Sequence, residues 1–354
     1  MPLLFEPIVF RSVQLRNRIV VSPMCQYNSV DGFANDWHLV HLGSRATGGA
    51  GLVFTEATAI SPEGRITPDD LGIWSDAHIE GLKRITSFIE AQGSVAGIQL
   101  SHAGRKASTS APWKGGRALT EGGWRTVAPS ALPFRADAPL PESLDDAGIQ
   151  KVLGDFAAAA RRARTAGFRI VEIHAAHGYL LHQFLSPLSN QRTDAYGGSF
   201  DNRARLLLEV VEAVRSEWPA DLPVFVRISA TDWTEGGFTV DDSIALAKLL
   251  SEIGVDLVDC STGGNVPKAE IPVGPLYQVP FAESIRRQSG IRTGAVGMIT
   301  TANEAEDILQ AGQADLIFLA RQLLRDPYFP LHAAQQLGAD LPWPVQYERA
   351  KPRS

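Results

Sequence analysis

Two histidines and a tyrosine stand close together at positions 174–179, where the sequence reads HAAHGY. Residues three apart on a regular strand face opposite ways, so the imidazoles of His174 and His177 converge only if the chain leaves the strand after His174. Gly178 makes such a turn easy because glycine has no side chain to restrict the backbone. Two imidazole N–H groups aimed at one point could stabilise a developing oxyanion, and Tyr179 lies just beyond them to deliver a proton.

The segment 22–27, with the sequence SPMCQY, offers peptide groups that could hydrogen-bond the edge of a planar heterocycle. Cys25 has no cationic neighbour in the sequence that would stabilise a thiolate. We therefore expect Cys25 to act as a weak hydrogen-bond donor rather than as a nucleophile. The alternative is a small buried apolar residue with no part in the chemistry.

Gln99 and Arg227 each lie near the end of an apolar run. A neutral amide beside a fixed cation suits the polar pyrimidine edge of a flavin, where negative charge collects on reduction. The alternative for Arg227 is a buried ion pair, for which Glu172 is the candidate partner because it is in phase on the neighbouring run.

Gly297 and Arg321 close two later apolar runs. A glycine lets a ligand approach the backbone, and an arginine can hold a phosphate through two parallel hydrogen bonds. The segment 102–106, with the sequence HAGRK, adds the cations Arg105 and Lys106. These residue types therefore indicate a site for an anionic ligand.

Eight short apolar runs, each ending near one of these residues, alternate with helical patterns along the chain. Such alternation predicts a parallel sheet. Eight parallel strands can close into a (β/α)8 TIM barrel, whose active site lies at the C-terminal mouth. The predicted strands are 18–24, 51–58, 95–102, 168–176, 224–230, 255–263, 291–298 and 314–321.

Helices are predicted between these strands. Ser143 is expected to cap a helix that runs to Gly167, and His38 and His41 fall on a helical pattern where packing or capping is expected. The other predicted helices are 76–92, 202–217, 240–253, 277–288 and 303–310.

Two connections and the C-terminal segment are longer than simple turns. The segment 103–142 carries Trp113 and Trp124, and 178–201 follows the fourth strand. Long loops on the catalytic face are typical of lids or binding walls. We expect residues 1–325 to form a single barrel domain. The segment 326–354, which shows no clear period, is either a disordered tail or an arm at a subunit interface.

The composition excludes several classes of function. The net charge of −6 gives neither a basic surface for nucleic acid nor a membrane-binding patch. No apolar run approaches the roughly 18 residues of a spanning helix, and the N-terminus has no signal-peptide pattern. The two cysteines cannot supply four thiolates to an iron–sulfur cluster or a disulfide framework, so a cytoplasmic location is expected.

The histidine pair has two other interpretations. The imidazoles could be structural, or they could bind zinc in a metal-dependent TIM-barrel hydrolase, although a catalytic zinc needs a third protein ligand. Barrel hydrolases of that kind carry His-x-His after the first strand, where this chain reads PMC at 23–25. The glycines at 48–51 precede a strand, so they do not form a dinucleotide-binding turn. A nicotinamide cofactor would therefore have to bind at the open mouth.

Together these motifs resemble the Old Yellow Enzyme family of flavin-dependent ene-reductases over nearly the whole chain. Any one motif is modest evidence, whereas all of them in this order are very specific. The motifs are LRNRI at 15–19, SPMCQY at 22–27, GR at 64–65, QLSHAGR at 99–105, HAAHGYL at 174–180, YGGS at 196–199, NR at 202–203 and LRDP at 324–327.

The resemblance implies a role for each site residue. His174 and His177 would bind the carbonyl oxygen of an α,β-unsaturated ketone or aldehyde, and Tyr179 would protonate its α-carbon. Cys25 would tune the flavin, while Tyr27 and Lys106 would contact the substrate. The residues implied to hold FMN are Ser22, Pro23, Met24, Cys25, Ala57, Gln99, Arg227, Gly297, Ala320 and Arg321.

The resemblance also implies the reaction. NADPH, in preference to NADH, would reduce FMN and leave, and the alkene would take its place in the same site. Hydride would then pass from N5 to the β-carbon, and nitro compounds or quinones are further candidate acceptors.

The pair Cys25 and Tyr27, together with the C-terminal motif QYER at 346–349, is similar to the thermophilic-like class, which includes xenobiotic reductases. This similarity implies a homodimer or homotetramer in which Arg349 reaches a neighbouring subunit's site. The loop 108–130 is longer than in the shorter members of that class, and the chain continues beyond Arg349.

Overall fold

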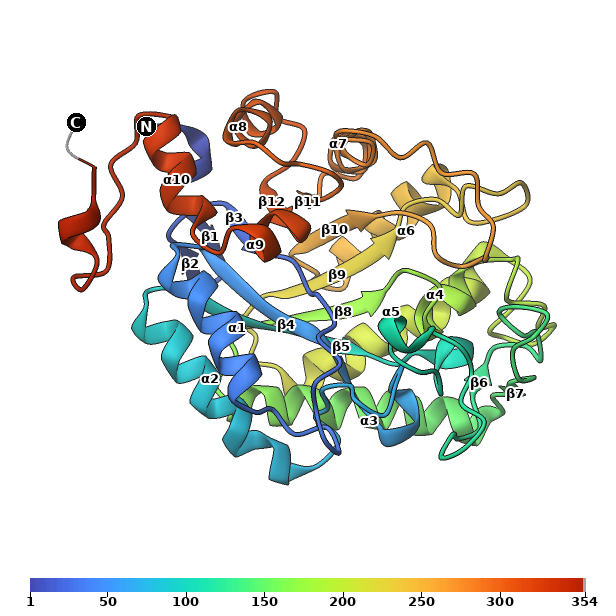
Figure 1. The fold of residues 1–354 in the computed structure, drawn as a ribbon. Coiled ribbons are helices and arrows are strands. Elements are labelled where there is room, and N and C mark those ends of the chain that lie inside the picture. Colours follow the sequence, from blue (N-terminus) through green and yellow to red (C-terminus); the bar gives the residue numbers. More distant parts are fainter. Residues whose placement is uncertain (353–354) are drawn as a thin grey trace.

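In the computed structural model, which describes residues 1–352, eight parallel strands close into one barrel (Figure 1). All eight predicted strands are present, because strands covered by helices outside and side chains inside form continuous apolar runs. Around the barrel they are β3 (Ile19–Val21), β4 (Leu52–Ala59), β5 (Val95–Ser101), β8 (Ile170–Ala175), β9 (Val224–Ser229), β10 (Leu257–Ser261), β11 (Arg292–Ala295) and β12 (Leu316–Leu319).

Helices surround the barrel and follow the predicted order. The helix expected to begin after Ser143 begins instead at Asp146, because the Asp145 carboxylate accepts the backbone N–H of Gly148. The helices are α1 (Asp36–Thr47), α2 (Ile79–Ala91), α3 (Asp146–Thr165), α4 (Leu180–Leu185), α5 (Phe200–Glu217), α6 (Val240–Glu252), α7 (Val279–Ser289), α8 (Ala302–Gln310), α9 (Arg321–Arg325) and α10 (Phe329–Gln336).

Two short strand pairs lie outside the barrel and were not predicted. The strands β1 (Ile8–Phe10) and β2 (Val13–Leu15) form an antiparallel hairpin. Phe10 of this hairpin is buried edge-on against Phe225 of β9, with ring centroids 5.1 Å apart. The long loop after β5 contains the other pair, β6 (Val127–Ala128) and β7 (Glu142–Ser143).

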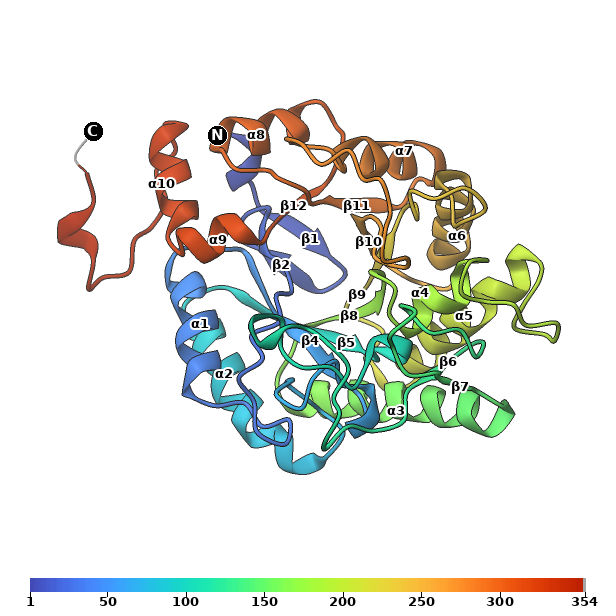
Figure 2. The same ribbon diagram turned by 45° about the vertical axis from the view of Figure 1, so that its right-hand side comes forward.

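The C-terminal segment has two parts. Residues 329–336 form α10, whose Phe329 and Leu331 are buried, although the sequence of 326–354 shows no clear period. The chain just before α10 passes close to Gly48. Glycine permits this contact, because a Cβ at position 48 would collide with the carbonyl oxygen of Pro327. The following residues extend away from the barrel (Figure 2).

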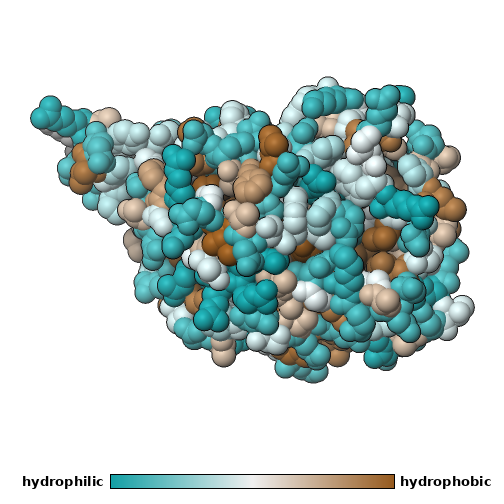
Figure 3. Space-filling view, turned by 90° about the horizontal axis from the view of Figure 1, so that it is seen from below, coloured by the Kyte–Doolittle hydropathy of each residue, from teal (hydrophilic) through white to brown (hydrophobic). Residues whose placement is uncertain are grey.

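The surface is mixed in character. The face in Figure 3 is mainly hydrophilic with scattered apolar side chains, and the C-terminal segment projects at its edge. Within residues 1–352, no helix combines the length and apolar character needed to span a bilayer.

Candidate active site

Four neighbouring strands bring the predicted polar residues together at the barrel mouth. In the strand register, Gln99 of β5 lies opposite Glu172 of β8, His174 of β8 opposite Arg227 of β9, and Arg227 opposite Asp259 of β10. All five residues are buried. The barrel therefore contains a buried polar layer at its mouth that includes His174.

Arg227 forms a buried ion pair, as its alternative interpretation required, but with a different carboxylate from the candidate Glu172. Arg227 Nε lies 3.1 Å from Asp259 Oδ2, and Arg227 Nη1 donates to Ser22 Oγ at 3.0 Å. Glu172, the candidate partner of Arg227, instead accepts a hydrogen bond of 2.7 Å from Gln99 Nε2. Burial and the charge of Asp259 raise the pKa of Glu172. The protonated form of Glu172 leaves Asp259 to balance Arg227.

The two histidines and Tyr179 form one aromatic cluster. The His174 ring lies edge-on to both, with centroids 5.2 Å from His177 and 5.0 Å from Tyr179. Strand β8 ends at Ala175, and His177 and Gly178 adopt φ of 57° and 72°. The chain therefore leaves the strand after His174, as the spacing predicted.

Backbone contacts hold this turn in place. The His177 N–H donates to Ser229 Oγ at 2.9 Å, and the His177 ring lies 2.7 Å through Nε2 from Ser261 Oγ. Gly178 packs so closely against Gly264 that a Cβ on either residue would strike the other loop. The loops after β8 and β10 are thus fixed against each other.

The electrostatic environment keeps both imidazoles neutral. Burial, with the Arg227 cation as the next cause, holds the pKa values of His174 and His177 well below their ordinary range. The Ala176 N–H donates to His174 Nδ1 at 3.2 Å. Because Nδ1 accepts a hydrogen bond, the proton of the neutral His174 ring lies on Nε2, where it can be donated.

Lys106 supports this turn from the loop after β5. Its Nζ donates to the backbone carbonyls of His177 at 2.8 Å and Gly264 at 3.0 Å, and lies 5.2 Å from the Tyr179 ring centroid. The expected substrate contact of Lys106 is untested. The structure adds a second role, which is to orient the His177 loop.

Cys25, Tyr27 and Tyr179 pack against the same small apolar group, formed by Ile66, Ala103 and Ala107. Burial is the main cause that raises the pKa of the Cys25 thiol well above its ordinary value. Burial also raises the pKa values of both tyrosines. The neutral thiol agrees with the expectation that Cys25 is not a nucleophile.

A separate cavity of about 330 Å³ lies where β10, β11 and β12 end. His177, Gly297, Ala320 and Arg321 line it. Gly297 has φ of 122°, and a Cβ there would crowd the Gln278 side chain. Within residues 1–352 no side chain pairs with the Arg321 guanidinium, which leaves a cation and backbone amides for an anion. These residue types fit a flavin phosphate.

Sequence reasoning missed a second group of polar residues behind the site. His182 Nδ1 accepts the Gly178 N–H at 2.9 Å, and its Nε2 lies 3.0 Å from Asp232, both side chains being fully buried. Likewise Glu56 accepts the Gln26 N–H at 2.9 Å and lies 3.2 Å from His38. Glu56 directly precedes Ala57 in β4 and Asp232 follows β9 by three residues, so their places near strand ends could have indicated them. The HAAHGYLLH spacing could have indicated His182.

His38 and His41 have the structural places expected of them. The Asn35 N–H donates to His38 Nδ1 in the capping box that begins α1. Buried His41 has a pKa lowered by burial to about 3.

We predict that His41 makes the protein less stable in mild acid. Its pKa is lower in the folded protein than the ordinary 6.5, so below pH 6.5 the unfolded chain binds a proton that the folded protein does not. The free energy of unfolding should fall by up to about 1.4 kcal/mol per pH unit from this residue. Urea unfolding between pH 7 and 5 should show a shallower decline for His41→Asn, and an unchanged slope would contradict the prediction.

Arg349 lies far from these residues along the extended C-terminal segment. It lines a cavity with Tyr328, Trp343 and Tyr347, which are also C-terminal. Figures 1 and 2 both show this segment outside the barrel. Arg349 therefore does not join the site of its own chain.

Among the described residues, no third metal-binding side chain joins the histidine pair. Within residues 1–352, no three His, Cys, Asp or Glu side chains come together in a way that could hold a metal ion. The neighbours of the pair are serine hydroxyls, Tyr179, the Arg227 cation and backbone groups.

Comparison with known proteins identifies the family of the chain. Residues 3–340 match the model of the NADH:flavin oxidoreductase / NADH oxidase family. The chain is 53% identical over 349 residues to a NADPH dehydrogenase of Bacillus velezensis, covering 98% of each chain. It is 51% identical over 348 residues to a NADPH dehydrogenase of Bacillus subtilis, again covering 98% of each.

Solved structures show the same architecture. Morphinone reductase superposes with a TM-score of 0.79 at 30% identity, over 96% of this chain and 91% of the other. An old yellow enzyme homologue from Zymomonas mobilis gives 0.77 at 28% identity, over 99% and 97%. These relatives do not favour a metal-dependent hydrolase. The chain belongs to the Old Yellow Enzyme family and is a flavin-dependent NAD(P)H oxidoreductase.

Proposed function

We propose that the protein is an FMN-dependent ene-reductase that prefers NADPH as its reductant. The observation that carries this proposal is the neutral His174–His177 pair beside Tyr179, with buried Arg227 in register with His174 and buried Gln99 nearby on β5. The chemistry that bound FMN supplies is hydride transfer from NAD(P)H to the β-carbon of an α,β-unsaturated carbonyl compound.

The protein's own residues hold the flavin in this account. Gln99 and Arg227, with Ser22 beside Arg227, would hold the polar edge of the flavin, and Gly297 with Arg321 would hold its phosphate. Ala57 of β4 pairs in register with Gln99 of β5. A bulge just before Ala57 interrupts the strand pairing, so backbone groups there are left out of the ladder. The further contacts that we assign to FMN are Pro23, Met24, Cys25 and Ala320.

The histidines bind and polarise the substrate oxygen. His174 presents its Nε2–H. We assign the hydrogen of the His177 ring to Nδ1, so that it can serve the same oxygen while Nε2 accepts from the Ser261 hydroxyl 2.7 Å away. Neutral donors stabilise the oxyanion as charge develops without protonating the ground state. Tyr179, also neutral, then delivers a proton to the α-carbon.

Isotopic labelling tests this function. The enzyme would be supplied with FMN, 2-cyclohexenone and NADPH carrying deuterium in the transferred position. The product should be cyclohexanone with deuterium only at the β-carbon, whereas deuterated water should label the α-carbon. Formation of the allylic alcohol, or no reduction of the alkene while NADPH still reduces the flavin, would contradict ene-reduction.

We predict that Tyr179→Phe slows re-oxidation of the reduced flavin by 2-cyclohexenone roughly 100-fold, since it removes the proton donor. Flavin reduction by NADPH should stay within about twofold. Stopped-flow measurement of the two half-reactions separates these effects, with Tyr27→Phe as the control. Equal slowing of both half-reactions would show that Tyr179 is not a proton donor.

We propose further that the C-terminal extension, described here as far as residue 352, packs at a subunit interface of a homodimer or homotetramer, with the part after α10 as an arm. Tyr347 and Arg349 lie on the part of the chain that leaves the barrel, where they could reach a neighbouring site.

Arg349→Ala should then raise the KM for 2-cyclohexenone severalfold, whereas Arg287→Ala, on the exposed face of α7, should not. Steady-state kinetics with analytical ultracentrifugation tests both points. A monomeric enzyme, or an unchanged KM for Arg349→Ala, would contradict the proposal that Arg349 reaches a neighbouring site.

A further inference from the structure

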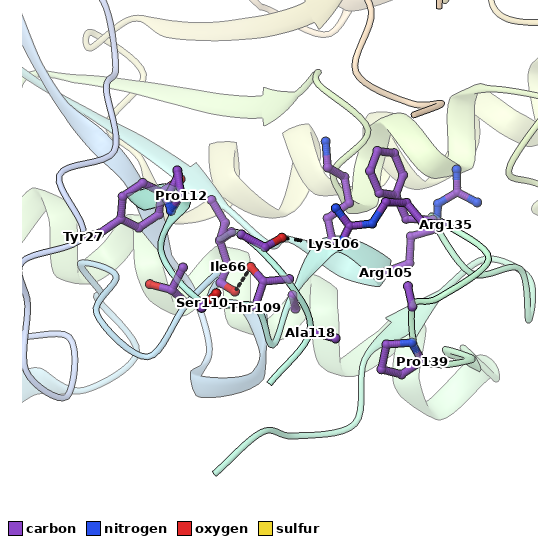
Figure 4. Close-up of a pocket in the computed structure, with 15 residues that line it drawn as sticks. Tyr27, Ile66, Arg105, Lys106, Thr109, Ser110, Pro112, Ala118, Arg135 and Pro139 are labelled. Carbon is purple, nitrogen blue, oxygen red and sulfur yellow. Dashed lines mark hydrogen bonds between the residues drawn. The ribbon is translucent and has the colours of Figure 1, made fainter. Parts of the chain in front are cut away.

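The long loop after β5 covers a second cavity of about 230 Å³ beside the proposed substrate site (Figure 4). Tyr27 and Pro112 lie at one end, and the basic side chains of Lys106, Arg105 and Arg135 lie at the other. The volume is too small for a whole ligand but has room for one substituent.

The three cations are incompletely paired. Arg105 is 7% exposed and donates to the carbonyls of Asn265 and Leu132, yet its buried Nε has no hydrogen-bond partner. Arg135 Nε also has no aligned partner, since Asp137 lies 3.4 Å away and is itself 69% exposed at its side chain. Lys106 Nζ reaches only two backbone carbonyls and lies 4.5 Å over the Phe134 ring.

Little negative charge compensates them. None of the described residues that line the cavity carries a carboxylate. Asp232 lies behind Arg105 but is engaged by His182, and Asp70 lies behind Ile66 with its pKa raised by burial to about 7. Burial, and then the charges of Arg105 and Arg135, lower the pKa of Lys106 to about 8. Burial is the larger cause of this lowering, and the two neighbouring cations add to it.

The cavity adjoins the proposed substrate site. Lys106 separates the two, because its Nζ holds the His177 carbonyl on one side and its chain lines the cavity on the other. Tyr27 belongs to both, since it lines the cavity and packs on the apolar group that contacts Tyr179. A ligand at the histidine pair could therefore extend past Tyr27 toward Arg135.

We propose that this cavity binds an anionic oxygen group, a carboxylate or a phosphate, carried by the ligand that occupies the histidine site. Two ligands could supply it. One is NADPH, whose 2′-phosphate distinguishes it from NADH; the other is an alkene substrate with a remote carboxylate, and this second source rests on the ene-reductase function proposed above.

Two paired comparisons distinguish the sources. The first compares NADPH with NADH in reducing the flavin. The second compares 6-oxohept-4-enoate and 8-oxonon-6-enoate with their methyl esters in re-oxidising it. Each ratio of kcat/KM is measured for the wild type, for Arg135→Gln, and for Arg125→Gln as the control. Arg125 lies in the same loop with its side chain 91% exposed and outside the cavity lining.

Arg135→Gln should lower at least one ratio roughly five- to tenfold, because a partly buried charge-assisted hydrogen bond is lost. A fall in the NADPH/NADH ratio identifies the 2′-phosphate, and a fall in the acid/ester ratio identifies a substrate carboxylate. Arg125→Gln should change neither ratio by more than about twofold.

The proposal would be overturned if Arg135→Gln had the same two kcat/KM ratios as the wild type. Its flavin spectrum and Tm must also be those of the wild type, which shows that the variant is folded. If the wild type reduces no alkene at all, the ene-reductase function fails. The NADPH/NADH comparison then still decides whether the cavity binds an anion.

Discussion

Replacing His174 by alanine should lower kcat/KM for 2-cyclohexenone roughly 100- to 1,000-fold, the usual cost of removing one oxyanion donor. The His174 ring is buried, neutral and has its hydrogen on Nε2, so alanine removes a donor that is already oriented. The oxidative half-reaction should lose more than flavin reduction by NADPH. Stopped-flow kinetics measures both.

Two further variants serve as controls for this result. His174→Asn keeps an N–H donor and should recover part of the loss. His41→Asn changes a buried histidine on α1, outside the mouth, and should affect stability without affecting the alkene reaction. If His174→Ala retained the kcat/KM of the wild type, the assignment of the oxyanion donors would be wrong.

Replacing Asp259 by alanine should reduce the free energy of unfolding by about 3–5 kcal/mol, because it leaves the Arg227 charge buried without its partner. The two side chains are 0% and 6% exposed and 3.1 Å apart. Flavin should also bind more weakly, since Arg227 would lose its orientation. Urea unfolding of the apoprotein and titration with FMN measure the two effects separately.

Matched variants test whether the ion pair is the cause. The double variant Arg227→Leu with Asp259→Leu should be more stable than Asp259→Ala, because no charge remains unpaired. Asp36 of α1 forms an exposed ion pair with Arg84 of α2. Asp36→Ala should therefore change the free energy of unfolding by no more than about 0.5 kcal/mol. A loss below about 1 kcal/mol in Asp259→Ala would contradict a buried, balanced pair.

The barrel could be predicted because its strands follow a local rule. A strand covered on both faces forms an uninterrupted apolar run, and a residue at its C-terminal end must face the mouth. The turn at His177 could be predicted for a similar reason, since two histidines three apart with a following glycine can converge only outside a strand.

The ion-pair partner of Arg227 could not be predicted from the sequence in the same way. Glu172 and Asp259 both lie on strands next to β9, and the choice between them depends on the register of each strand pair. Asp259 also lies within the apolar sequence LVDCS, where it resembles a strand residue of no special role. Register is set by the closure of the whole barrel rather than by any segment.

The other misses have physical causes of the same kind. The hairpin β1–β2 has strands of only three residues, too short for a period to emerge. Helix α10 spans eight residues and has Pro330 in its first turn, where proline is tolerated because that N–H needs no helical partner. The contacts of Lys106 connect loops that are 71 and 158 residues apart in sequence.

The most direct test of the account is a visible spectrum recorded in three steps without oxygen. The purified protein, supplied with FMN if needed, should be yellow. NADPH should bleach it, and 2-cyclohexenone should restore the colour. Colour that returns only when oxygen is admitted would contradict alkene reduction while leaving the flavin oxidoreductase intact. A protein that FMN cannot colour would contradict the proposed flavin site.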